Sequence, residues 1–175
     1  MDNGAWDYPA NTRGYTPSVV LQFVSPKYEW RYALSLTPKT ANGSEMNWDI
    51  ARANSSSLEF TYKYQIKNRG GALRLLSFYN TTHMGNYDES LRLQPDSPDI
   101  LQTRQYGRSK FGFTINAEQE ILPYLGCFLR TGWNDGENET WHYTEIDRTV
   151  SAGLVLSGDR WKRTTDNIGL AMVAS

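Results

Sequence analysis

The feature that most constrains this chain is a strict alternation of apolar and polar side chains along several runs of residues. Between residues 57 and 66 every second residue is apolar or aromatic, and the residues between them are polar or charged. Residues 28–37 follow the same rule, with Glu29 and Arg31 in the polar set. Since consecutive side chains of a strand point to opposite faces, each run predicts a strand with one apolar and one polar face. A slip of one residue would move Glu29 and Arg31 to the apolar face, so the side chains fix the register.

About eight such runs can be traced, and they predict an all-β fold in a single domain that spans residues 1–175. The expected strands cover residues 17–25, 28–37, 57–66, 72–80, 109–117, 123–133, 145–156 and 168–175. The seventh run begins with a charged end formed by Glu145, Asp147 and Arg148. Arg148 has the apolar parity of its strand, which indicates a bulge or a position at the rim. The residues before the first strand predict a loop with aromatic anchors.

The connections between these runs alternate in length. Short turns are expected near Pro26, at residues 68–71, where glycines supply positive φ, and at residues 118–120. Longer polar connections are expected at residues 38–56, 81–107 and 134–141. An outer-membrane barrel has tight turns at one end and long loops at the other, whereas a soluble sandwich has no reason to alternate. The pattern therefore predicts an antiparallel up-and-down meander that forms part of a transmembrane outer-membrane β-barrel.

Composition narrows the class of protein further. The mean hydropathy is −0.61, aromatic residues make up 13%, and the net charge is −1. There is no apolar run of about 18 residues, which excludes a helical membrane protein, and the near-neutral charge gives no reason to expect a nucleic-acid partner. The single Cys127 excludes an internal disulfide. No signal peptide precedes the opening residues, so the chain is expected to be either cytoplasmic or incomplete.

Several blocks of the sequence resemble the carbohydrate-selective porins of the OprB type. They are DNGAWDYPANTRGYT, LTPKTANG, SFYNTTHMGNYDESL, SKFGFTINAEQEI and GWNDGENETWHYTEIDRTVSAGLVLSGDRWKRTTDNIGLA. The blocks stand in the order of the family and span nearly the whole chain. The resemblance implies a channel in the outer membrane of a Gram-negative bacterium that passes sugars by passive diffusion through a barrel of roughly sixteen strands. It also implies that the chain is the central part of such a protein, incomplete at both ends.

The resemblance further implies outer-membrane lipid and lipopolysaccharide as surroundings, and a full-length parent that is a homotrimer or a monomer. No cofactor and no enzyme activity are expected, because a porin needs no reacting group. A pore for neutral, hydroxyl-rich solutes should offer weak hydrogen bonds, charges of both signs and aromatic rings.

The polar parity of the strands supplies such a set of side chains. The expected pore-lining residues are Glu29, Arg31, Glu59, Lys63, Arg74, Lys110, Arg130, Glu145 and Asp147, with Tyr124 and Phe128 as stacking rings. Arg31, Arg74 and Arg130 are expected at the narrowest part, because an arginine presents a rigid fork of donors to neighbouring hydroxyls. A charge that faces the lumen can equally be a solvated side chain without contact to sugar.

Other chemical interpretations are weaker. Glu145 and Asp147 could form a glycosidase acid–base pair, but an ion network at the rim explains them more simply. Asp135, Glu137 and Glu139 could hold a divalent cation between lipopolysaccharide phosphates and the protein, but a solvated loop tip is the simpler interpretation. We expect no metal site and no catalytic residue.

Two histidines and one cysteine could form sites by residue type, but their sequence surroundings do not support this. His83 and His142 are isolated in sequence and lack the Cys or His partners of a metal site. Cys127 falls on the apolar parity and is expected to act as a small hydrophobe.

Two other functions remain open from the residues alone. The first is a soluble carbohydrate-binding or carbohydrate-cleaving β-sandwich, whose shared interior would hold Leu34, Leu36, Phe60, Tyr62 and Leu154. The second is a complete small barrel with a plugged lumen, acting as a structural or adhesive outer-membrane protein.

Overall fold

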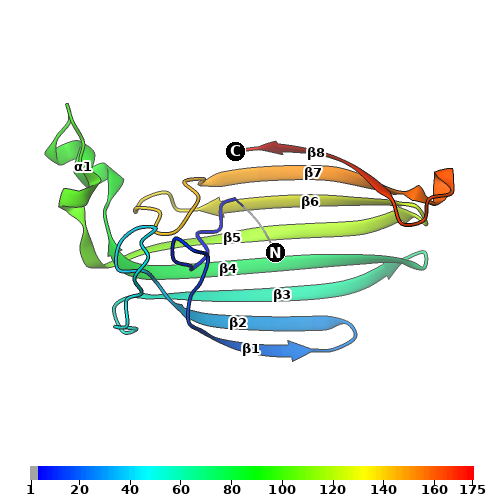
Figure 1. Cartoon of the computed structure of the whole chain (residues 1–175), viewed down its shortest axis with the longest axis horizontal. Coiled ribbons are helices and arrows are strands. Elements are labelled where there is room, and N and C mark those ends of the chain that lie inside the picture. Colours follow the sequence, from blue (N-terminus) through cyan, green and yellow to red (C-terminus); the bar gives the residue numbers. More distant parts are fainter. Residues whose placement is uncertain (1–3) are drawn as a thin grey trace.

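A single curved sheet of eight strands makes up the fold (Figure 1). The computed structural model describes residues 4–175, so the first three residues of the expected opening loop lie outside the described part. Each strand pairs antiparallel with the next in sequence, which confirms the predicted meander. The strands are β1 (Ser18–Val24), β2 (Tyr28–Leu36), β3 (Asn54–Ile66), β4 (Arg69–Met84), β5 (Gln105–Leu122), β6 (Leu125–Asn134), β7 (Arg148–Ser157) and β8 (Asn167–Ala174).

The strands next to the long connections extend further than the alternation predicts. β4 continues to Met84 and β5 begins at Gln105, so the predicted loop over residues 81–107 is shorter than expected. The ladder of backbone hydrogen bonds does not depend on an apolar pattern, and polar residues such as Ser55 and Asn80 lie in register within it. The shortened connection holds α1 (Tyr87–Leu93) and η1 (Ile100–Thr103), and a third short helix, η2 (Gly158–Trp161), follows β7. No helix in residues 4–175 is long and apolar enough to cross a membrane.

Two predicted turns are wrong in position. Lys67 and Asn68 form the turn between β3 and β4 with φ of 51° and 62°, while the glycines at 70 and 71 lie inside β4. A two-residue hairpin turn requires positive φ at both central positions, and here non-glycine residues adopt it. The turn predicted at residues 118–120 is also wrong, because β5 continues to Leu122 and the chain reverses at Pro123 and Tyr124.

The two faces of the sheet are those predicted by the alternation. On one face, called the outer face here, large apolar side chains are exposed, for example Leu75 at 42%, Phe113 at 52% and Leu154 at 47%. On the opposite, inner face, Thr61 and Asn80 are almost completely buried although they are polar. A soluble protein would bury the apolar face against a second layer. The described residues form one sheet, and its outer face is left open, which contradicts the sandwich interpretation.

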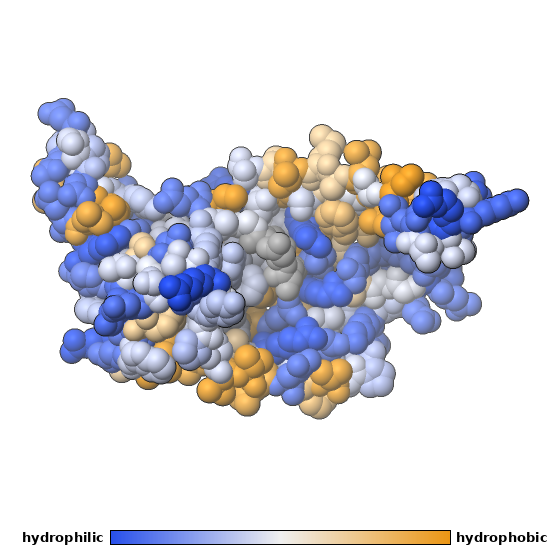
Figure 2. Space-filling model, in the orientation of Figure 1, coloured by the Kyte–Doolittle hydropathy of each residue, from blue (hydrophilic) through white to orange (hydrophobic). Residues whose placement is uncertain are grey.

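Hydrophilic side chains cover the inner face at both the long-loop end and the short-turn end, while hydrophobic residues lie mainly along the upper and lower margins of the view (Figure 2). The segment before β1 crosses the inner face at the end of the long loops (Figure 1). Asn134 Nδ2 donates to the carbonyl oxygen of Ala5 at 3.1 Å, and the Thr144 hydroxyl donates to that of Gly4 at 2.8 Å. This segment has neither strand nor helix, as predicted, and a small buried core forms beneath it around Ala5 and Trp141.

Candidate functional site

A network of charged side chains occupies the inner face of β2 and β3. Arg31 and Glu59 are partners in the strand register, and Arg31 Nη1 donates to Glu59 Oε1 at 2.8 Å. Arg31 also donates to Glu29, and Lys63 forms an ion pair with the other carboxylate oxygen of Glu29. Two carboxylates and two cations therefore share one side of two neighbouring strands, so their charges balance.

Arg74 and Arg130 continue this polar surface across β4, β5 and β6. The strand register places Arg74 opposite Asn116, and Asn116 opposite Arg130. Arg74 Nη2 donates to Glu118 Oε1 at 2.7 Å. The guanidinium carbon of Arg130 lies 5.0 Å from the centre of the Phe128 ring. Arg31, Arg74, Arg130 and Phe128 all lie on the face predicted for them.

A hollow of about 530 Å³ lies where the N-terminal segment meets β1, β2 and β3. Trp6 and Tyr8 line it from the segment, and Arg31 and Glu59 line it from the sheet. Ala5 and Asp7 are buried on either side of Trp6, so the segment presents alternate side chains to the hollow. The sequence indicated aromatic anchors here but did not place Trp6 and Tyr8 at a site, because a loop has no periodicity from which to infer a face.

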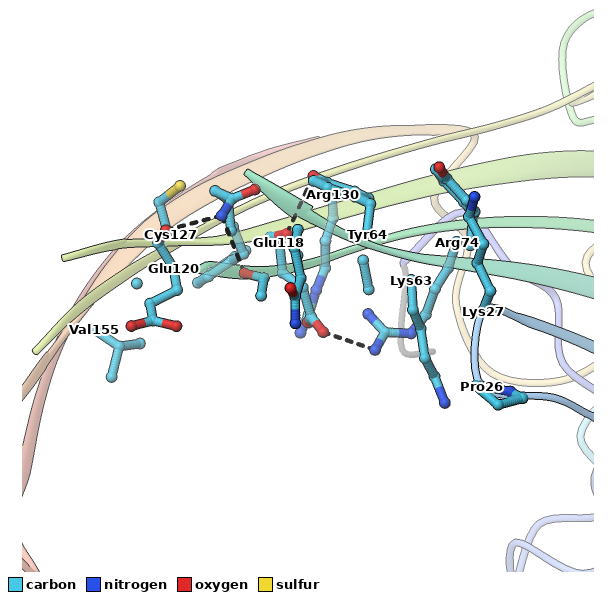
Figure 3. Close-up of a pocket in the computed structure, with 18 residues that line it drawn as sticks. Pro26, Lys27, Lys63, Tyr64, Arg74, Glu118, Glu120, Cys127, Arg130 and Val155 are labelled. Carbon is cyan, nitrogen blue, oxygen red and sulfur yellow. Dashed lines mark hydrogen bonds and ion pairs between the residues drawn. The ribbon is translucent and has the colours of Figure 1, made fainter. Parts of the chain in front are cut away.

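A larger hollow of about 1010 Å³ lies at the short-turn end of the inner face. Lys63, Arg74, Glu118 and Arg130 line it, and Figure 3 shows the ion pair of Arg74 with Glu118 on the concave side of the sheet. The sulfur of Cys127 points to the opposite side (Figure 3), as its apolar parity predicts.

Three expected site residues lie elsewhere than predicted, and a fourth lies on the predicted face but is enclosed. Glu145 and Asp147 are in the connection before β7 and not on a strand face, because β7 begins only at Arg148. Tyr124 lies in the turn after β5, with the guanidinium of Arg160 4.4 Å from its ring centre. Lys110 has the predicted inner parity, but its side chain has no exposed surface.

Lys110 is enclosed by the connection between β6 and β7. Its ammonium donates to the carbonyl oxygen of Asn138 at 3.1 Å and lies 3.5 Å from Asp147 Oδ1. The Lys110–Asp147 contact joins the loop to the sheet, so these two residues form an ion pair at the rim. Arg148 is exposed at the start of β7, as the rim position predicts.

The loop that holds Asp135, Glu137 and Glu139 is only partly exposed to solvent. Glu139 is 8% exposed, and its Oε2 accepts from Arg104 Nε at 2.8 Å and from the backbone N–H of Gly85 at 3.1 Å. The prediction of a solvated side chain is therefore wrong for Glu139, which ties two long connections together. Residues 4–175 contain no group of three His, Cys, Asp or Glu side chains arranged to hold a metal ion.

A buried, hydrogen-bonded pair of side chains, Asp7 and His142, holds the N-terminal segment in place. Asp7 Oδ1 lies 3.0 Å from His142 Nδ1 and accepts from the His142 backbone N–H at 3.0 Å. Asp7 Oδ2 accepts from Asn80 Nδ2 at 3.0 Å and from the Trp141 backbone N–H at 3.3 Å. Burial raises the pKa of Asp7, whereas the electrostatic interaction and the hydrogen bonds with His142 lower it. The lowering effects together are larger, so the pKa of Asp7 is below its ordinary value. His142 is thus an anchor that sequence reasoning missed.

Comparison with known proteins agrees with this geometry. The family model described as "Carbohydrate-selective porin, OprB family" matches residues 18–175. The solved structure titled "High pH structure of Pseudomonas putida OprB" is similar to the chain, with a TM-score of 0.68 and 17% sequence identity. The match covers 89% of this chain and 39% of that chain, so the chain spans well under half the length of that structure. A search of curated proteins finds no match. The chain therefore belongs to the OprB family of carbohydrate-selective porins, a family of bacterial outer-membrane proteins.

Proposed function

We propose that this chain forms part of the wall of a sugar channel in the outer membrane of a Gram-negative bacterium. Monosaccharides and oligosaccharides would pass it by passive diffusion. The observation that carries the proposal is the inverted sheet, whose outer face is apolar and exposed while its inner face holds paired charges and aromatic rings. An apolar face suits lipid, and a polar face suits a water-filled lumen.

The hollow beside the N-terminal segment has the chemistry that a sugar needs. Arg31 carries several N–H donors on a planar group, and Glu29 and Glu59 hold that group in place. Trp6 and Tyr8 add aromatic rings to the lining of the same hollow. Since each contact is weak and the local charges balance, a neutral sugar would bind loosely enough to leave again.

Further strands of a full-length protein would close the barrel, because β1 and β8 are unpaired edges among the described residues. We propose outer-membrane lipid and lipopolysaccharide as the surroundings of the outer face. The assembled protein would be a homotrimer or a monomer, and the chain itself would contribute no catalytic residue.

A plugged structural barrel is the second candidate. The segment before β1 covers part of the inner face and buries Asp7 against Trp141 and His142, which is what a plug would do. The two hollows that remain on this face favour a channel.

Block of ion current by sugar in planar bilayers tests the channel and its contact site together. The full-length protein is reconstituted, and the maltose concentration that halves the conductance is measured for Trp6→Ala and for Trp48→Ala. Trp48 is 73% exposed in the connection between β2 and β3 and serves as a matched control. We expect Trp6→Ala to raise the half-blocking concentration about twofold to tenfold, the scale of one aromatic contact. An equal effect of both substitutions would contradict the placement of the site.

A further inference from the structure

The larger hollow, at the short-turn end of the inner face, differs in charge from the hollow beside Trp6. Its charged lining residues are Lys27, Lys63, Arg74 and Arg130, together with Glu118 and Glu120. Two of these cations form ion pairs within the protein: Lys63 pairs with Glu29, and Arg74 pairs with Glu118. The arginine that lines the hollow beside Trp6 forms ion pairs with two carboxylates, so its charge is already neutralised within the protein.

Arg130 is the exception among the inner-face arginines of the described residues. It forms no ion pair, and its Nε is buried without an acceptor. Glu118 lies within electrostatic range of Arg130, but its carboxylate is already hydrogen-bonded to Arg74. The Phe128 ring supports the guanidinium from one side at 5.0 Å. The group is therefore oriented by packing against a ring and not by a carboxylate of the protein.

One register neighbour of Arg130 is a polar group that also lacks a partner. Asn116 stands directly opposite Arg130, is 4% exposed, and its Oδ1 accepts no hydrogen bond. The hollow itself is lined by the amide side chains of Gln65 and Gln119 as well as by Arg130. A cation without an ion pair of its own thus lies in a hollow with groups suited to hydroxyls.

We propose that Arg130 binds the carboxylate of an acidic sugar, an aldonate or a uronate, at a second contact site in the channel. This inference rests on the proposed function. The planar guanidinium matches a carboxylate with two parallel hydrogen bonds. The hydroxyls of the same solute would meet the amide side chains that line the hollow. The two sites differ in role, because the balanced site beside Trp6 suits neutral sugars and the site at Arg130 adds a preference for negative charge.

The test compares solutes of one size that differ in charge. The full-length protein is placed in planar bilayers between potassium chloride and potassium gluconate, and the zero-current potential gives the permeability ratio of gluconate to chloride. Swelling of proteoliposomes in isosmotic glucose is measured on the same preparations. Arg130→Gln keeps a polar side chain that can donate hydrogen bonds, although a shorter one, and removes its charge. Arg92→Gln is the matched control, since Arg92 is exposed on α1 away from the inner face.

We expect Arg130→Gln to lower the gluconate ratio about threefold to fivefold, the scale of an ion pair open to water. The loss should shrink near 1 M salt, where the screening length falls to about 3 Å. Glucose swelling should fall by a smaller factor than the gluconate ratio, and Arg92→Gln should change neither value.

Three results would overturn the inference alone. They are an equal loss of glucose and gluconate passage, an equal loss for acetate, which lacks the sugar hydroxyls, and no change at all. A wild-type protein that is inserted but passes no glucose would instead overturn the proposed function.

Discussion

Replacing Asp7 with alanine should release the N-terminal segment from the inner face. Asp7 is 1% exposed, and its carboxylate contacts His142, Trp141 and Asn80. Truncation leaves two buried backbone N–H groups without an acceptor, and it removes the hydrogen-bond partner of the His142 ring. Each buried polar group left without a partner costs about 1–3 kcal/mol, so the three together should cost about 3–5 kcal/mol, near the low end of that range.

The cost falls on local opening of the segment, because the strand ladders do not depend on Asp7. Each 1.4 kcal/mol changes an equilibrium about tenfold, so the opening equilibrium should rise between about a hundredfold and a few thousandfold. Hydrogen exchange followed by mass spectrometry on the protein in detergent micelles reads this directly, in peptides that cover residues 4–17 and 134–147. The peptides of β3 to β6 serve as an internal reference.

Asp88→Ala is the matched control, since Asp88 is exposed on α1 and its distance to Arg92 is 3.8 Å. It should leave exchange in residues 4–17 unchanged. Exchange in Asp7→Ala that equals that of the control would refute the reasoning, because the buried contacts would then contribute nothing to holding the segment.

The contact between Asp7 and His142 also predicts how the protection of the N-terminal segment depends on pH. The pKa of Asp7 is lowered in the folded protein, so its stabilising effect is complete above the ordinary value of 3.8 and is lost as the pH falls through the folded pKa. Protection of residues 4–17 should therefore hold from pH 7 down to about pH 4 and fall only below it.

Two further substitutions test the faces and the turns. Leu75→Arg on the outer face should weaken folding into lipid vesicles by about 2–4 kcal/mol in urea titrations, since a midplane arginine meets hydrocarbon. Leu75→Ala should cost much less, and an equal loss would contradict a lipid-facing position. Lys67→Asn combined with Asn68→Gly should stabilise the β3–β4 hairpin by about 1 kcal/mol, because both positions have positive φ. Gly70→Ala should be tolerated, since no atom lies within 4 Å of the added carbon, and a larger loss there would contradict the observed turn.

The alternation of side chains was sufficient to predict the strands and their faces. In a sheet with one apolar and one polar face, each side chain reports its own orientation, and no knowledge of distant residues is needed. Arg31, Arg74 and Arg130 could therefore be assigned to the inner face from their neighbours in sequence. Their ion-pair partners could not, because register between strands decides which carboxylate lies opposite.

The ends of strands and the turns were predicted less well. Tyr124 was assigned to a strand because β5 was expected to end before Gln119, yet backbone pairing carries it to Leu122. Glu145 was assigned to β7 from a parity that begins only at Arg148. Alternation is weak where polar residues dominate both parities, so it cannot locate the last pair of a ladder.

The contacts made by the N-terminal segment were not predictable from the sequence. Asp7 and His142 are 135 positions apart, and neither lies in a periodic segment. This anchor holds the chain between Trp6 and Tyr8, which both line the hollow on the inner face. Such a site depends on how a loop folds back over a sheet, and local sequence patterns do not determine the course of that loop.

Swelling of proteoliposomes in isosmotic sugar tests the central claim most directly. The full-length wild-type protein, with insertion verified by its heat-modifiable mobility, is compared with liposomes that lack protein. The account predicts swelling in glucose and in maltose, with the larger sugar slower. A correctly inserted barrel that gives no swelling in either sugar would contradict the channel and leave the plugged structural barrel as the explanation of the fold.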